Sequence, residues 1–482
     1  MITSDRVLAI FREITTIPRE SGHEEHIIEY LLQFAKKHNL NCKSDQAGNV
    51  LITKEASHGK ESSPTIILQS HSDMVCEKNS GIDFDFSKDP IKVEEENGWL
   101  IAKETTLGAD CGIGIAAQLA ILESNDLQHG KIECLFTTSE ETGLDGAKAL
   151  KPGFFTGKIL INLDSEDEGE LFIGCAGGID TTAKFRYTPV PTDPNTLFSN
   201  FYKVGFHGAI GGHSGDDIDK GRANAVQLLA RYLYNAFSLS YDLHLCHIDG
   251  GNKRNAIARE AYAIINFPQS LKNELEELFN TTLSEIQAEY SVTDPDISGT
   301  FTPAEAASEA VDNITSRALV ASLNCAPHGV LAMSPQIKGL VETSSNLASV
   351  KMETENIIRI GSSQRSSINS SRKYAAERVE SAFAVAGAEV SHESEYPGWR
   401  PNLDSQLLKV SEKTYKELFG ATPIVRAIHA GLECGLFLET FPDLDMISFG
   451  PTLRGVHAPG ERLEIASVDK FIKLLETILT KC

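Results

Sequence analysis

The chain has 482 residues, of which 41% are hydrophobic and 23% charged, as in an ordinary globular protein. This length exceeds the size at which one hydrophobic core keeps growing, so two or more domains are expected. The formal net charge of −23 argues against nucleic acid and anionic membranes as partners, because both attract basic surfaces. Nine dispersed cysteines without a Cys-x-x-Cys pair favour free thiols in a reducing compartment.

The N-terminal segment is expected to be an amphipathic helix, because Val7, Leu8, Phe11 and Ile14 recur at helical spacing. It has neither a basic leader nor a continuous apolar run, so no signal peptide is predicted. No segment approaches the roughly 18 apolar residues needed to cross a bilayer. A cytoplasmic location is therefore expected.

Residues 1–187 alternate between helical and strand-like patterns. Apolar runs rich in Ile and Leu at 64–70, 131–138 and 158–164 indicate strands, and 112–124 between them indicates a helix. Nearly continuous apolar strands separated by helices are typical of a parallel sheet covered on both faces. The predicted fold class is α/β with a mostly parallel central sheet.

After a Pro- and Thr-rich joint, residues 188–393 change character and are expected to form an inserted α+β domain. A strand followed by a helix at 221–237 has a counterpart in a later strand and a helix at 371–387, which indicates a weak internal duplication. Residues 394–482 return to the α/β pattern. The first domain is thus expected to be discontinuous, formed by 1–187 and 394–482.

Polar side chains with metal-binding chemistry follow the short apolar runs of the first domain. They are His71, Asp110, Glu140, Glu141, Asp164 and His457. Two imidazoles and three carboxylates can hold two divalent metals, and one carboxylate remains for proton transfer, a pattern that indicates metal-assisted hydrolysis. The ligand types suit two Zn²⁺ ions, with Co²⁺ or Mn²⁺ as possible substitutes. Cys76 and Cys111 lie near these residues in sequence but lack the paired spacing of a thiolate zinc site.

Some of these positions have an ordinary structural alternative. Asp110 precedes a helix and could be its N-cap instead of a carboxylate that bridges two metals. His71 and Asp73 form a His-x-Asp pair whose side chains share one face of a strand, so Asp73 could accept the second imidazole N–H. The adjacent Glu140 and Glu141 cannot be told apart from spacing. The charges of two divalent cations, three carboxylates and one bridging hydroxide sum to zero, and that hydroxide would be the nucleophile.

Several motifs together resemble one enzyme family over essentially the whole chain. They are HSDMV, LGADCGIG, TTSEETGLDGA, NLDSEDEGE, GGHSGDDIDKGRANA, AGLECG and GPTLRGVHAPGE. The chain is similar to the aminoacyl-histidine dipeptidases (peptidase D), di-zinc metallopeptidases related to carboxypeptidase G2 and aminoacylase. The resemblance implies one metal bound by His71, Asp110 and Asp164, and another bound by Asp110, Glu141 and His457.

The same resemblance implies roles for five further residues. Glu140 would be the general base and Asp73 would orient a metal-binding imidazole. In the inserted domain, His213 would stabilise the oxyanion of the transition state. Asn255 and Arg365 would bind the substrate carboxylate, for which a planar guanidinium is well suited.

The expected function is that of a metal-dependent dipeptidase acting on small dipeptides, with Xaa-His and β-alanyl-histidine among them. The inserted domain would be a lid that also mediates formation of a homodimer. One alternative is an N-acyl amino acid deacylase or amidase of the same fold. Another is a catalytically dead relative that only binds peptides, although none of the six expected metal-site positions is lost.

Overall fold

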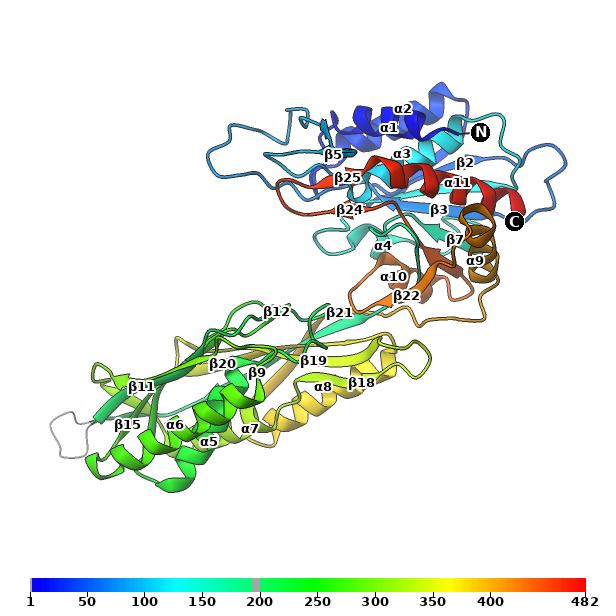
Figure 1. The fold of residues 1–482 in the computed structure, drawn as a ribbon. Helices are drawn as coiled ribbons and strands as arrows, with labels where there is room; N and C mark the ends of the chain where they lie inside the picture. Colours follow the sequence, from blue (N-terminus) through cyan, green and yellow to red (C-terminus); the bar gives the residue numbers. More distant parts are fainter. Residues whose placement is uncertain (1, 193–199) are drawn as a thin grey trace. The chain divides into compact units, whose positions relative to one another are not determined.

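The computed structural model describes residues 2–192 and 200–482, which form two compact units (Figure 1). The first unit comprises Met1–Cys175, Trp399–Ala427 and Leu432–Cys482. The second comprises Ala176–Gly398 and Ile428–Gly431, so it is inserted in sequence between parts of the first. It begins ahead of the expected boundary at residue 188 because the strand that starts at Gly177 belongs to its sheet.

The first unit is built on an eight-stranded sheet with a parallel centre. Its strands, in spatial order, are β1 (Asn41–Ser44), β2 (Val50–Lys54), β6 (Ile132–Thr137), β3 (Ile66–His71), β7 (Ile159–Asn162), β23 (Asp445–Ser448), β8 (Glu170–Cys175) and β22 (Ile424–Ile428). The four strands β6, β3, β7 and β23 run parallel to one another, whereas β1, β2 and β8 pair with their neighbours in antiparallel fashion. The α/β fold with a mostly parallel central sheet is thereby confirmed.

Helices flank this sheet, and a small second sheet completes the unit. The helices are α1 (Ser4–Ile14), α2 (Glu25–Lys37), α3 (Ala109–Glu123), α4 (Asp145–Ala149), α9 (Gln406–Phe419), α10 (Glu433–Thr440) and α11 (Ile465–Lys481). The small sheet has the order β24 (Leu453–Arg454), β25 (Arg462–Glu464), β5 (Trp99–Ile101) and β4 (Glu94–Glu96). Helix α3 is apolar on every side because it packs between α1 and β3, and the residues from Cys111 to Leu122 are buried.

The second unit contains a largely antiparallel sheet. Its strands, in spatial order, are β16 (Ser298–Pro303), β11 (Asn200–His207), β15 (Ala261–Phe267), β13 (His244–Gly251), β19 (Val341–Glu353), β20 (Ile357–Ser366), β9 (Gly177–Arg186) and β21 (Glu389–Tyr396), with β18 (Gly329–Met333) also paired to β19. Two short ribbons join β10 (Pro189–Pro191) to β17 (Glu309–Val311) and β12 (Gly212–His213) to β14 (Ala256–Ile257).

One face of the large sheet is covered by four helices (Figure 1). They are α5 (Ala225–Leu239), α6 (Lys272–Glu289), which follows the short 3₁₀ helix Gln269–Leu271, α7 (Asn313–Cys325) and α8 (Asn369–Ala384). Helix α5 begins later than its apolar pattern suggested, because the side chain of Asn224 accepts the N–H groups of Val226 and Gln227 and caps it. The internal duplication that pairs α5 with α8 stays a prediction.

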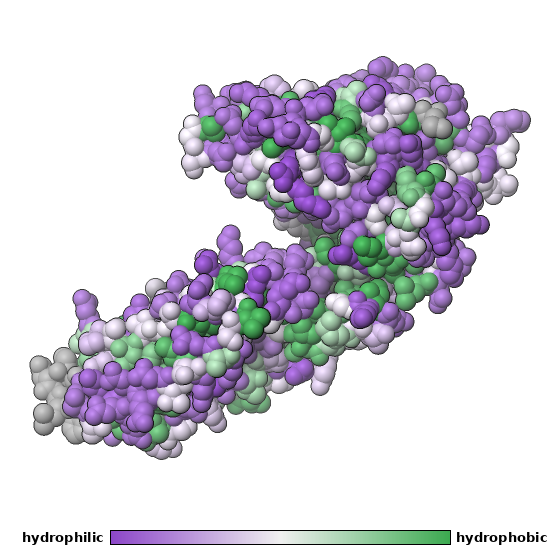
Figure 2. Space-filling model, viewed as in Figure 1, coloured by the Kyte–Doolittle hydropathy of each residue, from purple (hydrophilic) through white to green (hydrophobic). Residues whose placement is uncertain are grey.

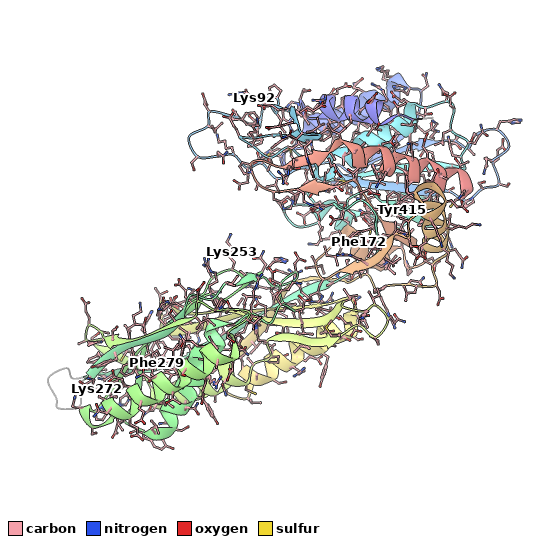
Figure 3. All side chains as sticks on the ribbon, viewed as in Figure 1. Lys92, Phe172, Lys253, Lys272, Phe279 and Tyr415 are labelled. Carbon is pink, nitrogen blue, oxygen red and sulfur yellow. The ribbon has the colours of Figure 1, made fainter. Side chains whose placement is uncertain are left out.

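The helices of the second unit bury their apolar faces in a core of their own. Phe279 of α6 (Figure 3) lies with its ring centroid 5.4 Å from that of Phe206 in β11 and 5.3 Å from that of Tyr232 in α5. On the visible face of the molecule, hydrophilic residues cover most of each unit's surface (Figure 2). Among the described residues, no helix is both long and apolar enough to cross a membrane.

Candidate metal centre

The candidate site lies at the carboxyl ends of the parallel strands in the first unit. His71 ends β3, Asp164 follows β7, and Glu140 and Glu141 follow β6. His457 comes from the loop between β24 and β25, after β23. Functional loops gather at this edge in open α/β sheets because all parallel strands present their carboxyl ends there. Strand order therefore brings together residues that are far apart in sequence.

Asp110 lies between two imidazoles. Its Oδ1 atom is 2.9 Å from Nε2 of His71, and its Oδ2 atom is 3.2 Å from Nε2 of His457. The N-cap of α3 is Gly108, and no backbone N–H among the described residues donates to the carboxylate of Asp110, whose oxygens face the two imidazoles instead. The N-cap alternative for Asp110 is therefore wrong, and its two oxygens are free to serve two cations.

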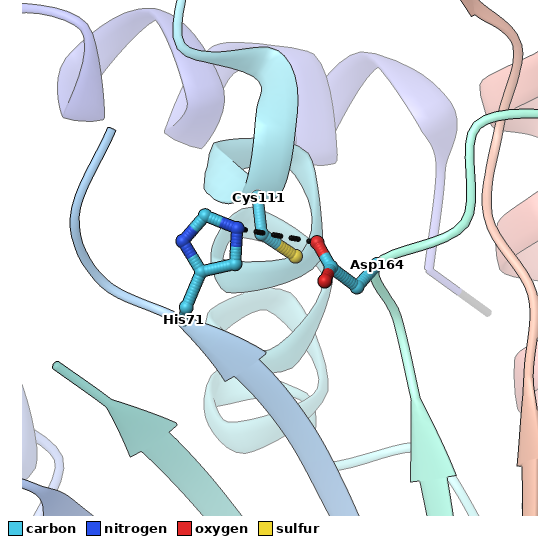
Figure 4. A group of neighbouring side chains, drawn as sticks. All are labelled: His71, Cys111 and Asp164. Carbon is cyan, nitrogen blue, oxygen red and sulfur yellow. Dashed lines mark ion pairs between the residues drawn. The ribbon is translucent and has the colours of Figure 1, made fainter. Parts of the chain in front are cut away.

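Two further carboxylates complete the cluster. Oδ1 of Asp164 is 3.2 Å from Nε2 of His71, and Oε1 of Glu141 is 3.0 Å from Nε2 of His457. Figure 4 shows the group of His71, Asp164 and Cys111. The groups His71–Glu140–Glu141 and Asp110–Glu141–His457 also converge closely enough to hold a cation. Nitrogen and carboxylate oxygen donors in this number fit divalent ions such as zinc.

The charges of this cluster perturb one another strongly. Burial raises the pKa of Asp164, and the negative charge of the nearby Asp110 raises it further, whereas His71 lowers it. The net result is a pKa of about 7. Hydrogen bonds to Asp110 and Glu141 raise the pKa of His457 to about 11. Burial raises the pKa of Glu140 well above its ordinary value. Several buried carboxylates in so small a volume repel each other, and bound cations would offset that repulsion.

Asp73 supports the cluster from below. It is fully buried, and its Oδ1 atom is 3.3 Å from Nδ1 of His71, the ring nitrogen opposite the one that faces Asp110. Its oxygens also accept the N–H groups of Glu140 (3.1 Å) and Glu141 (3.2 Å). Burial acts to raise the pKa of Asp73, but the nearby imidazole of His71 and the hydrogen-bond donors around the carboxylate lower it to about 2. Asp73 thus remains an anion that orients one imidazole and the glutamate pair.

Cys111 lies beside His71 and Asp164 but is poorly suited to bind metal. Its Sγ atom is 3.3 Å from the carbonyl oxygen of Leu163 and the side chain is buried. Burial raises the pKa of Cys111 well above that of a free thiol. Because metals bind the thiolate, this thiol is a weak candidate ligand.

The other three expected site residues lie in the second unit. His213 ends β12, and its Nδ1 atom accepts the N–H groups of Gly215 and Asp216, each at 3.3 Å. Asn255 and Arg365 line one cavity of about 280 Å³. Its other lining residues are Gly178, Ile179, Asp180, Arg254, Ser363, Ser394 and Tyr396.

Arg365 is oriented within this cavity by a tyrosine. Its Nη1 atom donates to the hydroxyl of Tyr396 at 3.0 Å. His429 lies close to the same residues: its Nε2 atom is 2.7 Å from Oγ of Ser344, and burial, reinforced by the positive charge of Arg365, lowers the pKa of His429 to about 4. Neither Tyr396 nor His429 was identified from the sequence.

A row of buried polar side chains beneath the metal cluster also escaped the sequence analysis. Nε2 of Gln69 donates to Glu433 (2.6 Å) and Nδ2 of Asn162 donates to Oε1 of Gln69 (2.6 Å). Thr137 also donates to Glu433 (2.9 Å), and Ser448 donates to Asn162. All five are fully buried. These bonds tie β6, β3, β7 and β23 together, and Gln69, Thr137 and Asn162 lie two or three residues before candidate ligands. Gln69 and Asn162, the first polar residues after the apolar runs of β3 and β7, were the available signal.

An open α/β sheet with such a cluster at its strand ends defines a metal-dependent hydrolase. Residues 67–481 match the family described as Peptidase family M20/M25/M40. The chain belongs to this family of metallopeptidases.

Three relatives match the chain over nearly its full length. The cytosol non-specific dipeptidase of Escherichia coli (strain K12) is 39% identical over 98% of this chain and 96% of its own. The crystal structure of aminoacylhistidine dipeptidase from Vibrio alginolyticus is 38% identical, with a TM-score of 0.92 over 99% of this chain and 96% of the other. The aminopeptidase PepT from Bacillus cereus ATCC 10987 is 16% identical with a TM-score of 0.59 over 100% and 99% of the two chains, and shares the fold. The resemblance drawn from the sequence motifs is confirmed.

Proposed function

We propose that this protein hydrolyses dipeptides in a metal-dependent reaction, with Xaa-His dipeptides, including β-alanyl-histidine, among its substrates. The observation that carries the proposal is the Asp110 carboxylate, whose two oxygens face His71 and His457 at 2.9 and 3.2 Å. One carboxylate shared in this way suits two cations held side by side. Two full-length relatives named as dipeptidases support a small peptide as the substrate.

The proposed cofactors are two Zn²⁺ ions, for which Co²⁺ or Mn²⁺ could substitute. His71, Asp110 and Asp164 would hold one ion, and Asp110, Glu141 and His457 the other. Such ions supply Lewis-acid activation of water and of the peptide carbonyl. Imidazole and carboxylate donors without a thiolate support zinc over softer metals.

Glu140 is the proposed general base. It would take a proton from the attacking water and deliver it to the leaving amine, so that cleavage yields a free carboxylate and an amine. The raised pKa of Glu140, caused first by burial, suits a group that must both accept and release a proton. Asp73 would hold Glu140 in position, because it accepts the backbone N–H groups of Glu140 and Glu141.

The second unit is proposed to bind the substrate. Arg365 and Asn255 would hold the free carboxylate of the dipeptide in the cavity that they share. His213 would stabilise the oxyanion. Its Nδ1 atom lies 3.3 Å from two backbone N–H groups and 3.4 Å from Oδ2 of Asp216.

We further propose the second unit, which the sequence analysis placed at 188–393 and which comprises Ala176–Gly398 and Ile428–Gly431, as a lid that mediates homodimer formation. The first unit, expected at 1–187 and 394–482, is the proposed catalytic domain. A cytosolic location is proposed because the Escherichia coli relative carries that word in its name. All nine cysteines are free thiols in the structure, which supports a reducing compartment.

The test is hydrolysis of carnosine and a panel of other dipeptides by zinc-loaded protein, beside N-acetylated amino acids. We expect dipeptide cleavage that is lost on chelation and restored by Zn²⁺. Cleavage of the N-acetylated compounds alone would make the protein a deacylase of the same fold. Peptide binding without any cleavage by zinc-loaded protein would make it a binding scaffold.

A further inference from the structure

The short loop that presents Asp110 is held by one buried carboxylate. Oε2 of Glu461 accepts the N–H groups of Leu107 (2.7 Å) and Gly108 (2.9 Å). Oε1 accepts those of Ala109 (2.8 Å) and, at longer range, Asp110 (3.4 Å). The side chain of Glu461 is only 1% exposed. Four amides that the start of α3 would otherwise leave unpaired therefore converge on a single group from a distant part of the chain.

A buried guanidinium holds the same loop through its carbonyl groups. Arg19, which is also 1% exposed, donates to the carbonyl oxygen of Gly108 and to those of Ser72 (3.2 Å) and Asp73 (2.5 Å). Gly108 has φ +68°, and a Cβ atom there would lie within 2.7 Å of Arg19 and Met74. Arg19 thus joins the loop after His71 to the loop before Asp110.

Glu461 is itself fixed to the protein at its backbone. Its carbonyl oxygen accepts the N–H of Ala102 (3.2 Å), and its own N–H donates to Ala458 (3.1 Å). The next residue begins β25, which pairs with β5. His457 lies four positions earlier, in the same turn. Glu461 therefore lies on the loop that carries His457, and its side chain binds the loop that carries Asp110.

We propose that Glu461 is a positioning residue that sets the place of Asp110 relative to His457 and thereby makes the shared metal site. This inference rests on the proposed metal-binding function. A carboxylate that binds two cations must direct one oxygen at each of them. A small rotation of the backbone of Asp110 would therefore weaken the binding of both ions. Four hydrogen bonds to successive amides prevent that rotation, since each N–H direction is fixed separately.

The test compares Glu461→Gln with Glu133→Gln. The first substitution places an NH₂ group against backbone N–H donors and keeps the size of the side chain. Glu133 is a matched control because it is buried and accepts the N–H groups of Thr156 (2.7 Å) and Gly157 (2.9 Å). It lies near the amino end of β6, whereas the candidate metal ligands follow the carboxyl ends of the strands.

Zinc affinity is measured by competition with a chromophoric chelator, and folding by circular dichroism. We expect Glu461→Gln to weaken zinc binding by about 10- to 100-fold, the range seen when a group that orients a metal ligand is lost. Glu133→Gln should lose stability but bind zinc as the wild type does. Glu461→Asp, a carboxylate one methylene shorter, provides a second folded variant and should also bind zinc more weakly.

The role of Glu461 would be overturned if either Glu461 variant, once shown to be folded, bound zinc as tightly as Glu133→Gln does. That result would leave the proposed function intact. Wild-type protein that binds no zinc would instead overturn the proposed metal site, and the role of Glu461 with it.

Discussion

Glu140 and Glu141 are neighbours in sequence but have different surroundings in the fold. Oε1 of Glu141 faces Nε2 of His457 at 3.0 Å, whereas no ion pair of Glu140 is found among the described residues. Their backbone amides both donate to Asp73. Spacing alone left their roles open, and this difference supports Glu141 as the ligand and Glu140 as the proton carrier.

Glu140→Ala is expected to lower kcat for dipeptide hydrolysis by about 100-fold or more, because a general base contributes on that order. Zinc content should remain at two ions per chain, since Glu140 is not among the proposed ligands. The measurements are initial rates and metal analysis of the dialysed protein. Asp145→Asn, a change at the exposed first residue of α4, is the control and should keep wild-type activity. Activity that survives in Glu140→Ala with zinc bound would show that another group is the base.

At the scale of secondary structure, single buried side chains join elements from separate parts of the chain. In the second unit, Nδ1 of His328 accepts the N–H of Leu347 in β19 (3.1 Å) and the side-chain amide of Asn224, the cap of α5 (3.4 Å). Burial lowers the pKa of His328 to about 4. Protonation of this ring would remove the acceptor that joins β19 to α5.

This contact predicts a loss of stability in acid. The pKa of His328 is about 4 in the folded state and about 6.5 in an unfolded chain. The neutral ring therefore contributes its full stability above pH 6.5, and the contribution is lost as the pH falls from 6.5 through 4. Between pH 7 and pH 4.5 the loss should be about 2 kcal/mol.

His328→Gln keeps a hydrogen-bond acceptor but cannot titrate. Urea unfolding of the second unit, followed at both pH values, should show a smaller loss for this variant than for the wild type. An identical pH dependence in the two proteins would contradict the assignment of this effect to His328.

At the scale of the whole molecule, the chain has two units with separate hydrophobic cores. The second unit buries its own cluster of apolar side chains, including Phe206, Tyr232 and Phe279. All five proposed metal ligands belong to the first unit. Metal binding is therefore expected to stabilise one unit selectively.

Removal of zinc by a chelator should lower the unfolding temperature of the first unit and leave that of the second nearly unchanged. A ligand present at 100 times its Kd stabilises the state that binds it by about 2.7 kcal/mol. For a unit of this size the shift is roughly 5 °C. Calorimetry gives the transitions, and hydrogen exchange read by peptide identifies the unit that opens. Equal shifts of both units would show that they unfold as one.

Much of the first unit of this protein could be predicted from its sequence. The apolar runs that became β3, β6 and β7 are followed by polar residues, and His71, Glu140 and Asp164 come at or just after the carboxyl ends of these strands. Buried charges could not be predicted in this way. Glu433, Glu461 and Arg19 have no local feature that separates them from surface charges, because their burial depends on partners far away in the chain.

The sequence by itself therefore determined the α/β class of the first unit, the chemical types of the candidate ligands and the family, since each depends on local pattern and motif. Only the tertiary structure decided which atoms meet. It excluded Asp110 as a helix cap and placed its two oxygens toward two imidazoles. It also brought Glu461 onto the loop of Asp110. The contacts of Asp110 with His457 and of Glu461 with the Asp110 loop join residues more than 300 positions apart, and their geometry depends on the packing of the whole sheet.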